Sequence, residues 1–351
     1  MTQRIPVTIL GATGTVGQKL IRLLDQHPWF EIAALTASDA SAGRRYGDVV
    51  RWRETTPLPE RAAQLEILPS RTPLDLPLAF SALDTQAAAE IEPLWAGAGS
   101  LVVTNASPFR LEPDVPLVIP EVNADHLGLL PTQRARRGWK GGIVANPNCT
   151  TTGLALVLAP LHRRFGVEKL FVSTMQAISG AGWPGVASLD IVGNVVPYIA
   201  NEEEKVERET RKLLGALQGT AIAEAPTVVS AHTNRVPVVD GHTETVSVGF
   251  ATPVSPDQVA EALASWRPEP AIAALPSTPA QPVLVDPRPD RPQPRLDLDA
   301  GRGMSVTVGR IRPCPLLQIR LVLLSHNTVR GAAGATIQNA ELLVARGVVA
   351  R

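Results

Sequence analysis

Two cysteines are present, and only one lies where a thiol could become a nucleophile. Cys149 ends the stretch Ala145-Asn146-Pro147-Asn148-Cys149, between a predicted strand at 143–145 and a helical pattern at 154–161. The N-terminus of a helix stabilises negative charge, so we expect the pKa of this thiol to be lowered and the attacking thiolate to be favoured. A lone cysteine is more often a small core residue, and that alternative stays open. Cys314, which lies between two prolines, is interpreted as structural.

One of the six histidines is well placed to move a proton. His242 lies at a predicted turn, directly before an alternating strand pattern at 243–250. A histidine held in position near neutral pH is the usual proton shuttle. A solvated turn histidine remains the alternative on the residues alone.

A glycine-rich loop indicates that a nucleotide is bound. Gly11-Ala12-Thr13-Gly14-Thr15-Val16-Gly17 follows an apolar run at 7–10 and opens a helical pattern at 16–24. Glycines let the backbone approach a pyrophosphate, and the helix N-terminus holds its negative charge. A tight turn that binds nothing is the alternative.

The loop after the second predicted strand bears on the choice of cofactor. NAD-binding folds often place an acid there for the ribose hydroxyls. Here two serines and two arginines could hold a 2′-phosphate, which favours NADP: Ser38, Ser41, Arg44 and Arg45. Asp39 stands among them, so NAD and an ordinary charged loop both remain open.

The elements that must position these residues change character along the chain. Up to about residue 150, short apolar runs alternate with helical patterns, which predicts a parallel sheet with helices on its faces. Further on, the patterns at 169–175 and 243–250 alternate with period two, which suits a mostly antiparallel sheet with one buried face. We expect a loop at 267–298 and one amphipathic helix at 327–351. The predicted fold class is therefore α/β, a Rossmann-type domain plus an α+β domain.

A charged segment at about 202–217 is predicted to be a helix. Glu202 and Lys205 are three residues apart and so share one face of it. The segment also holds the pairs that any exposed helix carries, Glu204 with Arg208 and Glu207 with Arg211. On the residues alone, we expect the whole run to be solvated.

Length and charge limit the classes of function. A chain of 351 residues suggests two domains. Formal net charge is zero, which gives no sign of a nucleic-acid or membrane-surface partner. No signal peptide is recognised, and no apolar run reaches the roughly 18 residues of a membrane span. Two thiols cannot form a disulfide framework, so we expect a cytoplasmic setting. We predict no metal site.

Seven segments, in this order, resemble the aspartate-semialdehyde dehydrogenase family, in its archaeal and fungal branch. They are GATGTVG at 11–17, SPFR at 107–110, NPNCTT at 146–151, QAISGAGWPGV at 176–186, NVVPYIANEEEK at 194–205, NRVPVVDGHTE at 234–244 and GAAGATIQNAELL at 331–343. They span nearly the whole chain. The set is specific, although each piece alone is not.

The resemblance implies a role for each matching residue. Cys149 matches the nucleophile with Asn148 beside it, Gln176 matches the residue that orients the acyl intermediate, and His242 matches the acid/base. Four more match substrate-binding residues: Arg235 for the carboxylate, Glu202 for the amino group, and Lys205 and Arg110 for the phosphate. The cofactor-binding set gains Ser81, Ser179, Gly180 and Asn327. Asn327 is the least secure match, because His326 and Thr328 replace the family's usual neighbours.

The implied activity is NADPH-dependent reduction of L-4-aspartyl phosphate to L-aspartate 4-semialdehyde and phosphate, in lysine, threonine and methionine biosynthesis. N-acetyl-γ-glutamyl-phosphate reductase typically carries NPGC where this chain has NPNC. Malonyl-CoA reductase keeps the cysteine and histidine, but Arg235 and Glu202 favour an amino-acid substrate. A non-catalytic NADP-binding paralogue is a third alternative, against which Cys149 and His242 argue.

The resemblance also implies a domain division and an assembly. We expect a dinucleotide-binding domain at 1–148, completed by the C-terminal helix at 327–351. A catalytic and dimerisation domain would occupy 149–326. The family implies a homodimer or homotetramer, with the exposed face of the second sheet as the interface.

Overall fold

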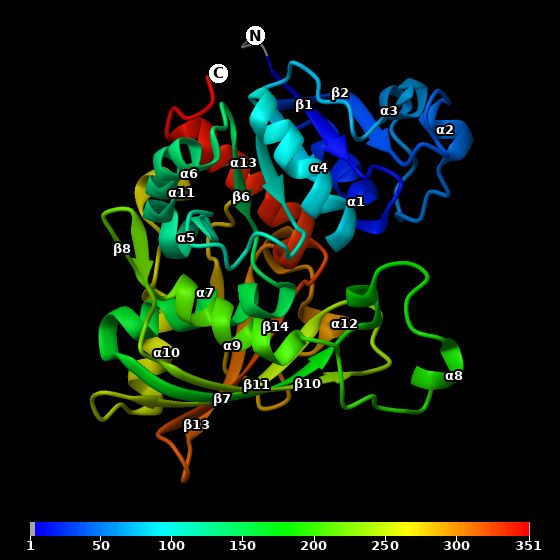
Figure 1. Cartoon of the computed structure of the whole chain (residues 1–351). Helices are drawn as coiled ribbons and strands as arrows, with labels where there is room; N and C mark the ends of the chain where they lie inside the picture. Colours follow the sequence, from blue (N-terminus) through cyan, green and yellow to red (C-terminus); the bar gives the residue numbers. More distant parts are fainter. Residues whose placement is uncertain (1–3, 351) are drawn as a thin grey trace.

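The computed structural model describes residues 4–350 and contains two six-stranded sheets and a small hairpin of β8 (Ala216–Gln218) and β9 (Ala221–Ala223). The first sheet lies in the upper part of Figure 1, with the C-terminal helix beside it, and the second sheet lies in the lower part. The N-terminal and C-terminal ends lie near each other at the top.

The first sheet is parallel throughout, as its alternating pattern predicted. Its strand order is β3-β2-β1-β4-β5-β6. The strands are β1 (Ile5–Leu10), β2 (Phe30–Ala37), β3 (Ile67–Pro69), β4 (Leu78–Ser81), β5 (Leu101–Thr104) and β6 (Gly142–Ala145). The order reverses between β1 and β4, and ligands of such sheets bind beyond the carboxyl ends of the strands at that reversal.

The helices of the first unit bury apolar side chains against this sheet. They are α1 (Thr15–Leu24), α2 (Tyr46–Val49), α3 (Glu60–Gln64), α4 (Thr85–Ala98), α5 (Pro120–Asn123) and α6 (Leu130–Arg137). One core joins α1 to the strands and to the C-terminal helix α13 (Gly334–Ala345). A second core joins α4 to the other side of the strands and continues into the second unit.

The second sheet is mixed, with order β10-β7-β11-β14-β13-β12. Its strands are β7 (Val167–Gln176), β10 (Val228–Arg235), β11 (His242–Phe250), β12 (Val283–Asp286), β13 (Val306–Pro313) and β14 (Ile319–Ser325). The three central pairings are antiparallel and the two outer pairings are parallel. Its helices are α7 (Cys149–Phe165), α8 (Ser188–Ile191), α9 (Glu202–Leu213), α10 (Pro256–Ser265), α11 (Pro270–Ala273) and α12 (Pro294–Asp297).

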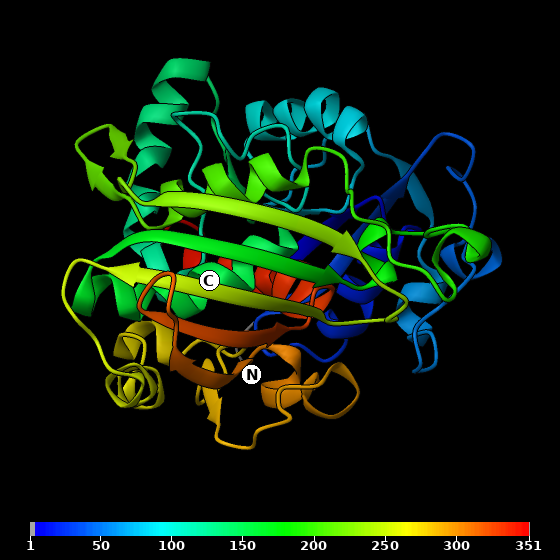
Figure 2. The same ribbon diagram turned by 90° about the horizontal axis from the view of Figure 1, so that it is seen from below.

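Helix α7 covers the inner face of this sheet and is buried along most of its length. The outer face lies uncovered in Figure 2. Phe171 on β7 and Val228 on β10 project from it, 42 % and 65 % exposed. This matches the predicted sheet with one buried face.

Three sequence predictions about elements were wrong in part. Residues 267–298 are not all loop, because β12 pairs with β13 there. The charged helix ends at Leu213 and a hairpin follows it. The C-terminal segment is a π-turn at Val329–Ala333 followed by α13, and Arg351 lies outside the described residues.

Helix α13 is also buried on all sides from Gly334 to Leu343, so it is not amphipathic in its packing. Its polar residues are satisfied by partners instead of water. Asn339 donates to the carbonyl of Val118, and Gln338 donates to Glu121. The Glu121 carboxylate also accepts hydrogen bonds from both terminal nitrogens of Arg330, at 2.9 and 2.8 Å, and both side chains are fully buried. This bidentate pair ties the C-terminal segment to the first unit.

Candidate active site

Cys149 is the first residue of α7, at the turn the sequence predicted. The side chain of Asn148 caps the helix by accepting from the N–H groups of Thr150 and Thr151 at 2.9 and 3.3 Å. The C-terminal segment packs closely against Cys149, since a Cβ on Gly331 would lie 2.7 Å from the Cβ of Cys149.

His242, the first residue of β11, lies directly against the thiol. Its Nε2 is 3.2 Å from Cys149 Sγ, although the residues are 93 positions apart. Its Nδ1 accepts from the backbone N–H of Ala177 at 3.1 Å. A neutral ring that accepts at Nδ1 carries its proton on Nε2, so His242 points an N–H at the sulfur.

Burial sets the charge state of both groups. It lowers the pKa of His242 to about 3, with help from Arg235 and His326, so the ring is neutral at pH 7. Burial also raises the pKa of the Cys149 thiol to about 12, and the Glu202 carboxylate adds to that rise. Arg110, Arg235 and the N–H of Thr150 act in the opposite direction. The expected lowering by the helix N-terminus is therefore wrong for the free protein, because burial and a nearby anion outweigh it.

Arg235 and Gln176 end two adjacent strands. The parallel ladder of β10 and β7 pairs Arg235 with Gln176, and both side chains are buried. Arg235 Nη1 donates to the carbonyl of Ala177 at 2.8 Å, so one residue orients both Arg235 and His242. A Cβ on Gly180 would lie 2.8 Å from that nitrogen and 3.1 Å from His242 Cε1. Gly180 is thus needed for space beside the site.

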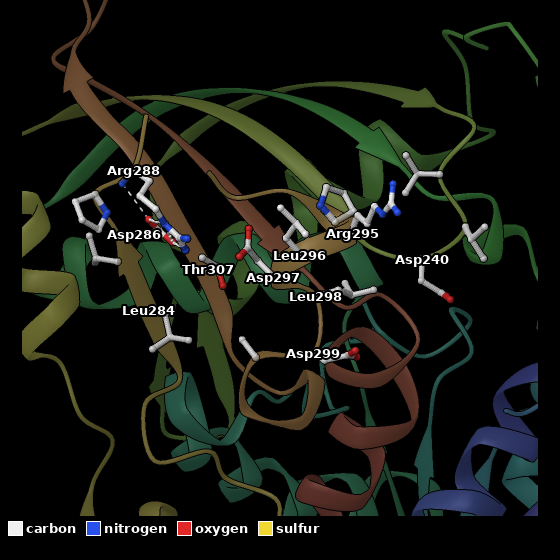
Figure 3. A pocket seen from close by; sticks show the side chains of 16 residues that line it. Asp240, Leu284, Asp286, Arg288, Arg295, Leu296, Asp297, Leu298, Asp299 and Thr307 are labelled. Atoms are coloured by element: carbon white, nitrogen blue, oxygen red, sulfur yellow. Dashed lines mark hydrogen bonds and ion pairs between the residues drawn. The ribbon is translucent and has the colours of Figure 1, made fainter. Parts of the chain in front are cut away.

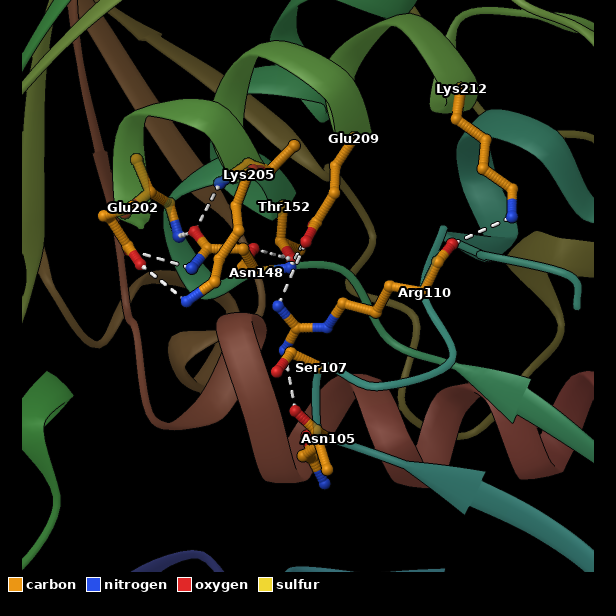
Figure 4. Close-up of polar contacts among 12 residues, drawn as sticks. Asn105, Ser107, Arg110, Asn148, Thr152, Glu202, Lys205, Glu209 and Lys212 are labelled. Carbon is orange, nitrogen blue, oxygen red and sulfur yellow. Dashed lines mark hydrogen bonds and ion pairs between the residues drawn. The ribbon is translucent and has the colours of Figure 1, made fainter. Parts of the chain in front are cut away.

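Helix α9 brings charged side chains to Asn148, the residue before the thiol (Figure 4). Glu202 accepts from Asn148 Nδ2 at 2.8 Å and lies 3.7 Å from Lys205 Nζ. Arg110 donates to Glu209 at 3.1 Å and to the carbonyl of Asn105 at 2.7 Å. All four residues predicted to hold a substrate therefore lie near Cys149, with cations and an anion interspersed.

The charged helix is not the solvated run expected from its residues alone. Glu202, Glu209 and Lys212 are buried, whereas Glu203 and Glu204 are exposed. Arg211 pairs with Glu224 at 3.2 Å, and Glu207 accepts from the N–H of Ala231 at 3.1 Å. Sequence reasoning missed Glu209 and Lys212. They follow Glu202 by seven and ten residues and so lie on the same helix face, which was the pattern that could have indicated them.

The glycine loop forms a cradle that a dinucleotide fits. Gly11 has φ +76°, and a Cβ there would lie 2.8 Å from the carbonyl of Ala82. A Cβ on Gly17 would lie 2.3 Å from the carbonyl of Gly11. Gly14 caps α1 without a side-chain hydrogen bond, so the first N–H groups of α1 face the cavity without a side-chain acceptor. Uncapped N–H groups beside close backbone contacts suit a pyrophosphate.

A cavity of about 480 Å³ continues from this loop past the end of β2. The predicted residues Gly11, Thr13, Gly14 and Ser38 line it, with Asp39, Ser70 and Arg71. Ser41 and Arg44 are not among its lining residues. Arg71, which sequence reasoning missed, follows β3 and is brought to the cavity by the pairing of β3 with β2.

The remaining predicted cofactor residues lie toward the thiol. Thr15 and Ser179 line a second cavity of about 310 Å³ between the two units. Asn327 donates to Ser179 Oγ and accepts from the N–H of Gly241, both at 2.8 Å. Asn327 thus links the segment that follows β7 to the turn that precedes β11. Ser81, at the end of β4, and Val16, in the first turn of α1, lie beside the glycine loop.

A cavity of about 1000 Å³, larger than either of these two, lies elsewhere, along β12 and the segment around α12 (Figure 3). Two of its acidic residues form ion pairs nearby, Asp286 with Arg288 and Asp297 with Arg291. Neither Cys149 nor His242 lines it. Size therefore does not locate the reactive groups in this molecule.

The comparisons with known proteins agree with this arrangement of two units. A model of the semialdehyde dehydrogenase NAD-binding domain matches residues 6–130, and one of the semialdehyde dehydrogenase dimerisation domain matches residues 158–330. The chain thus belongs to the semialdehyde dehydrogenases, a class of two-domain oxidoreductases with a Rossmann-type domain.

Within that class, relatives identify the branch. Aspartate-semialdehyde dehydrogenase of Archaeoglobus fulgidus is 49 % identical over 347 residues, covering 99 % of this chain and 100 % of that protein. The crystal structure of aspartate semialdehyde dehydrogenase with NADP from Candida albicans superposes with a TM-score of 0.91 at 42 % identity, covering 99 % and 100 %. Aspartate semialdehyde dehydrogenase II of Vibrio cholerae, solved in complex with ASA, has a TM-score of 0.77 at 27 % identity, covering 98 % and 99 %. The chain belongs to the aspartate-semialdehyde dehydrogenase family, and the predicted archaeal and fungal resemblance is confirmed.

Proposed function

We propose that Cys149 and His242 give this member of the family its activity, the NADPH-dependent reduction of L-4-aspartyl phosphate to L-aspartate 4-semialdehyde. The observation that carries the proposal is the 3.2 Å contact between Cys149 Sγ and a His242 nitrogen that bears a proton. His242 is fully buried and Cys149 is partly buried at this contact. The cofactor is NADP, as the relative solved with NADP supports.

Covalent chemistry begins at Cys149. Its thiolate attacks the acyl carbon of the substrate, the C–O bond to phosphate breaks, and a thioester forms on Sγ. Bound NADPH supplies the hydride that reduces the acyl carbon. The oxygen of the resulting thiohemiacetal anion accepts a hydrogen bond from His242 Nε2–H, and its collapse returns the aldehyde and the Cys149 thiolate. His242 acts here as a donor, because its Nδ1 is occupied by the N–H of Ala177.

The charges around Cys149 match the substrate group by group. Arg235 takes the carboxylate, since a guanidinium binds a carboxylate through two parallel hydrogen bonds. Glu202 takes the ammonium group, and Lys205 with Arg110 takes the phosphate. Gln176 and Asn148 orient the acyl group and the start of α7.

Ammonium binding at Glu202 also bears on the nucleophile. The Glu202 carboxylate raises the pKa of Cys149 in the free protein. A substrate ammonium beside Glu202 offsets that anion and so favours the thiolate. The substrate therefore helps to activate the thiol that attacks it.

For the dinucleotide, the glycine loop holds the pyrophosphate, and Ser38 with Arg71 lies where a 2′-phosphate would be bound. Arg44 and Ser41 remain in the proposed set only if their loop closes on the cofactor. We also assign to the cofactor Ser81, at the end of β4, Gly180, beside His242, and Ser179 with its partner Asn327. Residues 1–148 with 327–351 remain our proposed dinucleotide-binding domain, and 149–326 the catalytic domain.

The second unit matches a dimerisation domain, and we place a homodimer interface on the outer face of its sheet. That face exposes Phe171 and Val228. The segment between β7 and α9 exposes three more large apolar residues, Leu189, Val192 and Tyr198. A homotetramer built from two such dimers is the alternative assembly. Among the described residues, no helix has the length and apolar character to cross a membrane. Both cysteines are free thiols, which fits the proposed cytoplasmic setting.

One assay tests the activity. We expect NADP reduction with L-aspartate 4-semialdehyde and phosphate, and no NADPH oxidation with malonyl-CoA. The Candida albicans enzyme is the natural positive control. Turnover of malonyl-CoA alone would reject aspartyl phosphate as the substrate, and turnover of neither would support a non-catalytic paralogue.

A further inference from the structure

Glu209 is a buried anion at the centre of the substrate side (Figure 4). Its Oε1 accepts from Arg110 Nη1 at 3.1 Å. Its Oε2 accepts from the backbone N–H of Asn148 at 2.6 Å. One carboxylate thus joins the proposed phosphate-binding guanidinium to the residue that precedes the nucleophile.

The same helix holds the backbone around Arg110. Lys212 Nζ donates to the carbonyls of Arg110, Glu112 and Val115, each at 2.8 Å. Lys212 lies three residues after Glu209, on the same side of α9. Helix α9 therefore fixes Arg110 twice, by its main chain and by its side chain.

The charge of Glu209 has a consequence for an anion bound at Arg110. A buried guanidinium needs a counterion, and Glu209 supplies one in the free protein. That same negative charge opposes a phosphate drawn to Arg110, because unlike water the interior screens charges weakly. Burial raises the pKa of the Glu209 carboxyl, and the Arg110 guanidinium and the Asn148 N–H oppose that rise.

We infer that Glu209 is a positioning residue that orients Arg110 and Asn148 and keeps the phosphate site weak enough to release phosphate. The inference rests on the proposed function in taking phosphate as the ligand at Arg110. If the site bound the free phosphate product as tightly as the substrate phosphate, that affinity would not increase turnover. Glu209 thus holds the Arg110 side chain in its orientation while lowering the affinity of Arg110 for phosphate.

Three variants test this. Glu209→Gln keeps an acceptor and removes the charge, Glu209→Asp keeps the charge and shortens the reach, and Glu207→Gln is the matched control. Glu207 lies on the same helix and also accepts a backbone N–H, that of Ala231, but it contacts β10 instead of the site. Inorganic phosphate is titrated by calorimetry into the NADP-saturated protein, and KM for phosphate and kcat are measured in the oxidative direction.

Glu209→Gln should lower the Kd and the KM for phosphate roughly three- to ten-fold. Glu209→Asp should keep the parental Kd but lose kcat, and Glu207→Gln should match the parent in all three. An unchanged or raised phosphate Kd in Glu209→Gln would overturn the inference. If that variant does not fold, a parental kcat in Glu209→Asp would do so. Calorimetry needs no turnover, so it decides the inference even if L-aspartate 4-semialdehyde is not a substrate.

Discussion

The two sides of the active-site cleft are built in opposite ways. On the cofactor side, the glycine loop and the start of α1 present backbone N–H groups that no side chain caps. On the substrate side, the charged groups already have partners: Arg110 with Glu209, Lys205 with Glu202, and Arg235 with the carbonyl of Ala177. The cofactor side is thus an open set of donors, and the substrate side is a set of charges oriented in advance. Charges that are already oriented need no reorganisation during the reaction, and the reaction takes place on the substrate side.

The largest effect should come from removing the thiol that lies between the two sides. Cys149→Ala should reduce turnover by roughly 10⁴-fold or more, because no thioester can form. NADP binding, measured by fluorescence titration, should persist, since the cradle is separate from the thiol. Cys314→Ala is the control and should stay active, because the Cys314 thiol bonds to Ser247 at 3.7 Å and not to any residue of the site. A fully active Cys149→Ala protein would reject the covalent mechanism.

The next effect should be confined to the substrate side. Arg235→Lys should cost about 2–4 kcal/mol in kcat/KM, because an ammonium cannot reproduce a bidentate contact. NADP affinity should barely change. The loss should shrink with a substrate analogue that lacks the α-carboxylate. Equal losses with both substrates would make Arg235 structural, through its bond to Ala177.

A smaller effect should reveal the charge of Glu202 in the free protein. Burial and Glu202 raise the pKa of Cys149, so removing this carboxylate lowers the pKa and increases the thiolate fraction at a given pH. Glu202→Gln should alkylate with iodoacetamide roughly three- to ten-fold faster at pH 8, and both proteins should react faster as the pH rises. Exposed Glu204→Gln serves as the control. Equal rates in all three proteins would show that Glu202 does not influence the thiol.

The smallest effect should fall on the cofactor side. Arg71→Ala should weaken NADP binding by roughly 0.5 kcal/mol, about two-fold, and leave NAD binding nearly unchanged, since Arg71 lines the cavity beside Ser38 but is exposed and already paired with Glu90. Arg44→Ala is the informative comparison, because Arg44 does not line that cavity. Selective loss of NADP affinity in Arg44→Ala alone would show that its loop closes on the cofactor. Equal preference of the parent for both dinucleotides would assign the ribose to Asp39.

The same contrast explains what the sequence could predict. The glycine loop and the turn at Cys149 are local patterns, in which strand, loop and helix follow one another along the chain. The contact between Cys149 and His242 spans 93 residues, and that between Arg110 and Glu209 spans 99. Composition and periodicity do not encode such pairs. Local patterns indicated Cys149 and His242 separately, the resemblance placed them in one site, and Glu209 was missed.

Charge state was harder still to predict than position. A helix N-terminus indicated a low pKa for Cys149, but that rule omits burial and the carboxylate that α9 brings close. Periodicity predicted an amphipathic C-terminal helix, yet the structure surrounds α13 with α1, α5 and two strands of the first sheet. In both cases the local rule held until tertiary contacts outweighed it.

The return of the C-terminal segment gives the chain a particular order of construction. Residues 329–345 fill the core between α1 and the first sheet, and Arg330 is locked there by Glu121. The second unit is therefore an insertion within the first, in terms of the chain's course. During synthesis, the inserted unit can complete its sheet with β14 before the dinucleotide-binding unit has its last helix. The dinucleotide-binding unit, although encoded first, is therefore the last to receive all of its helices.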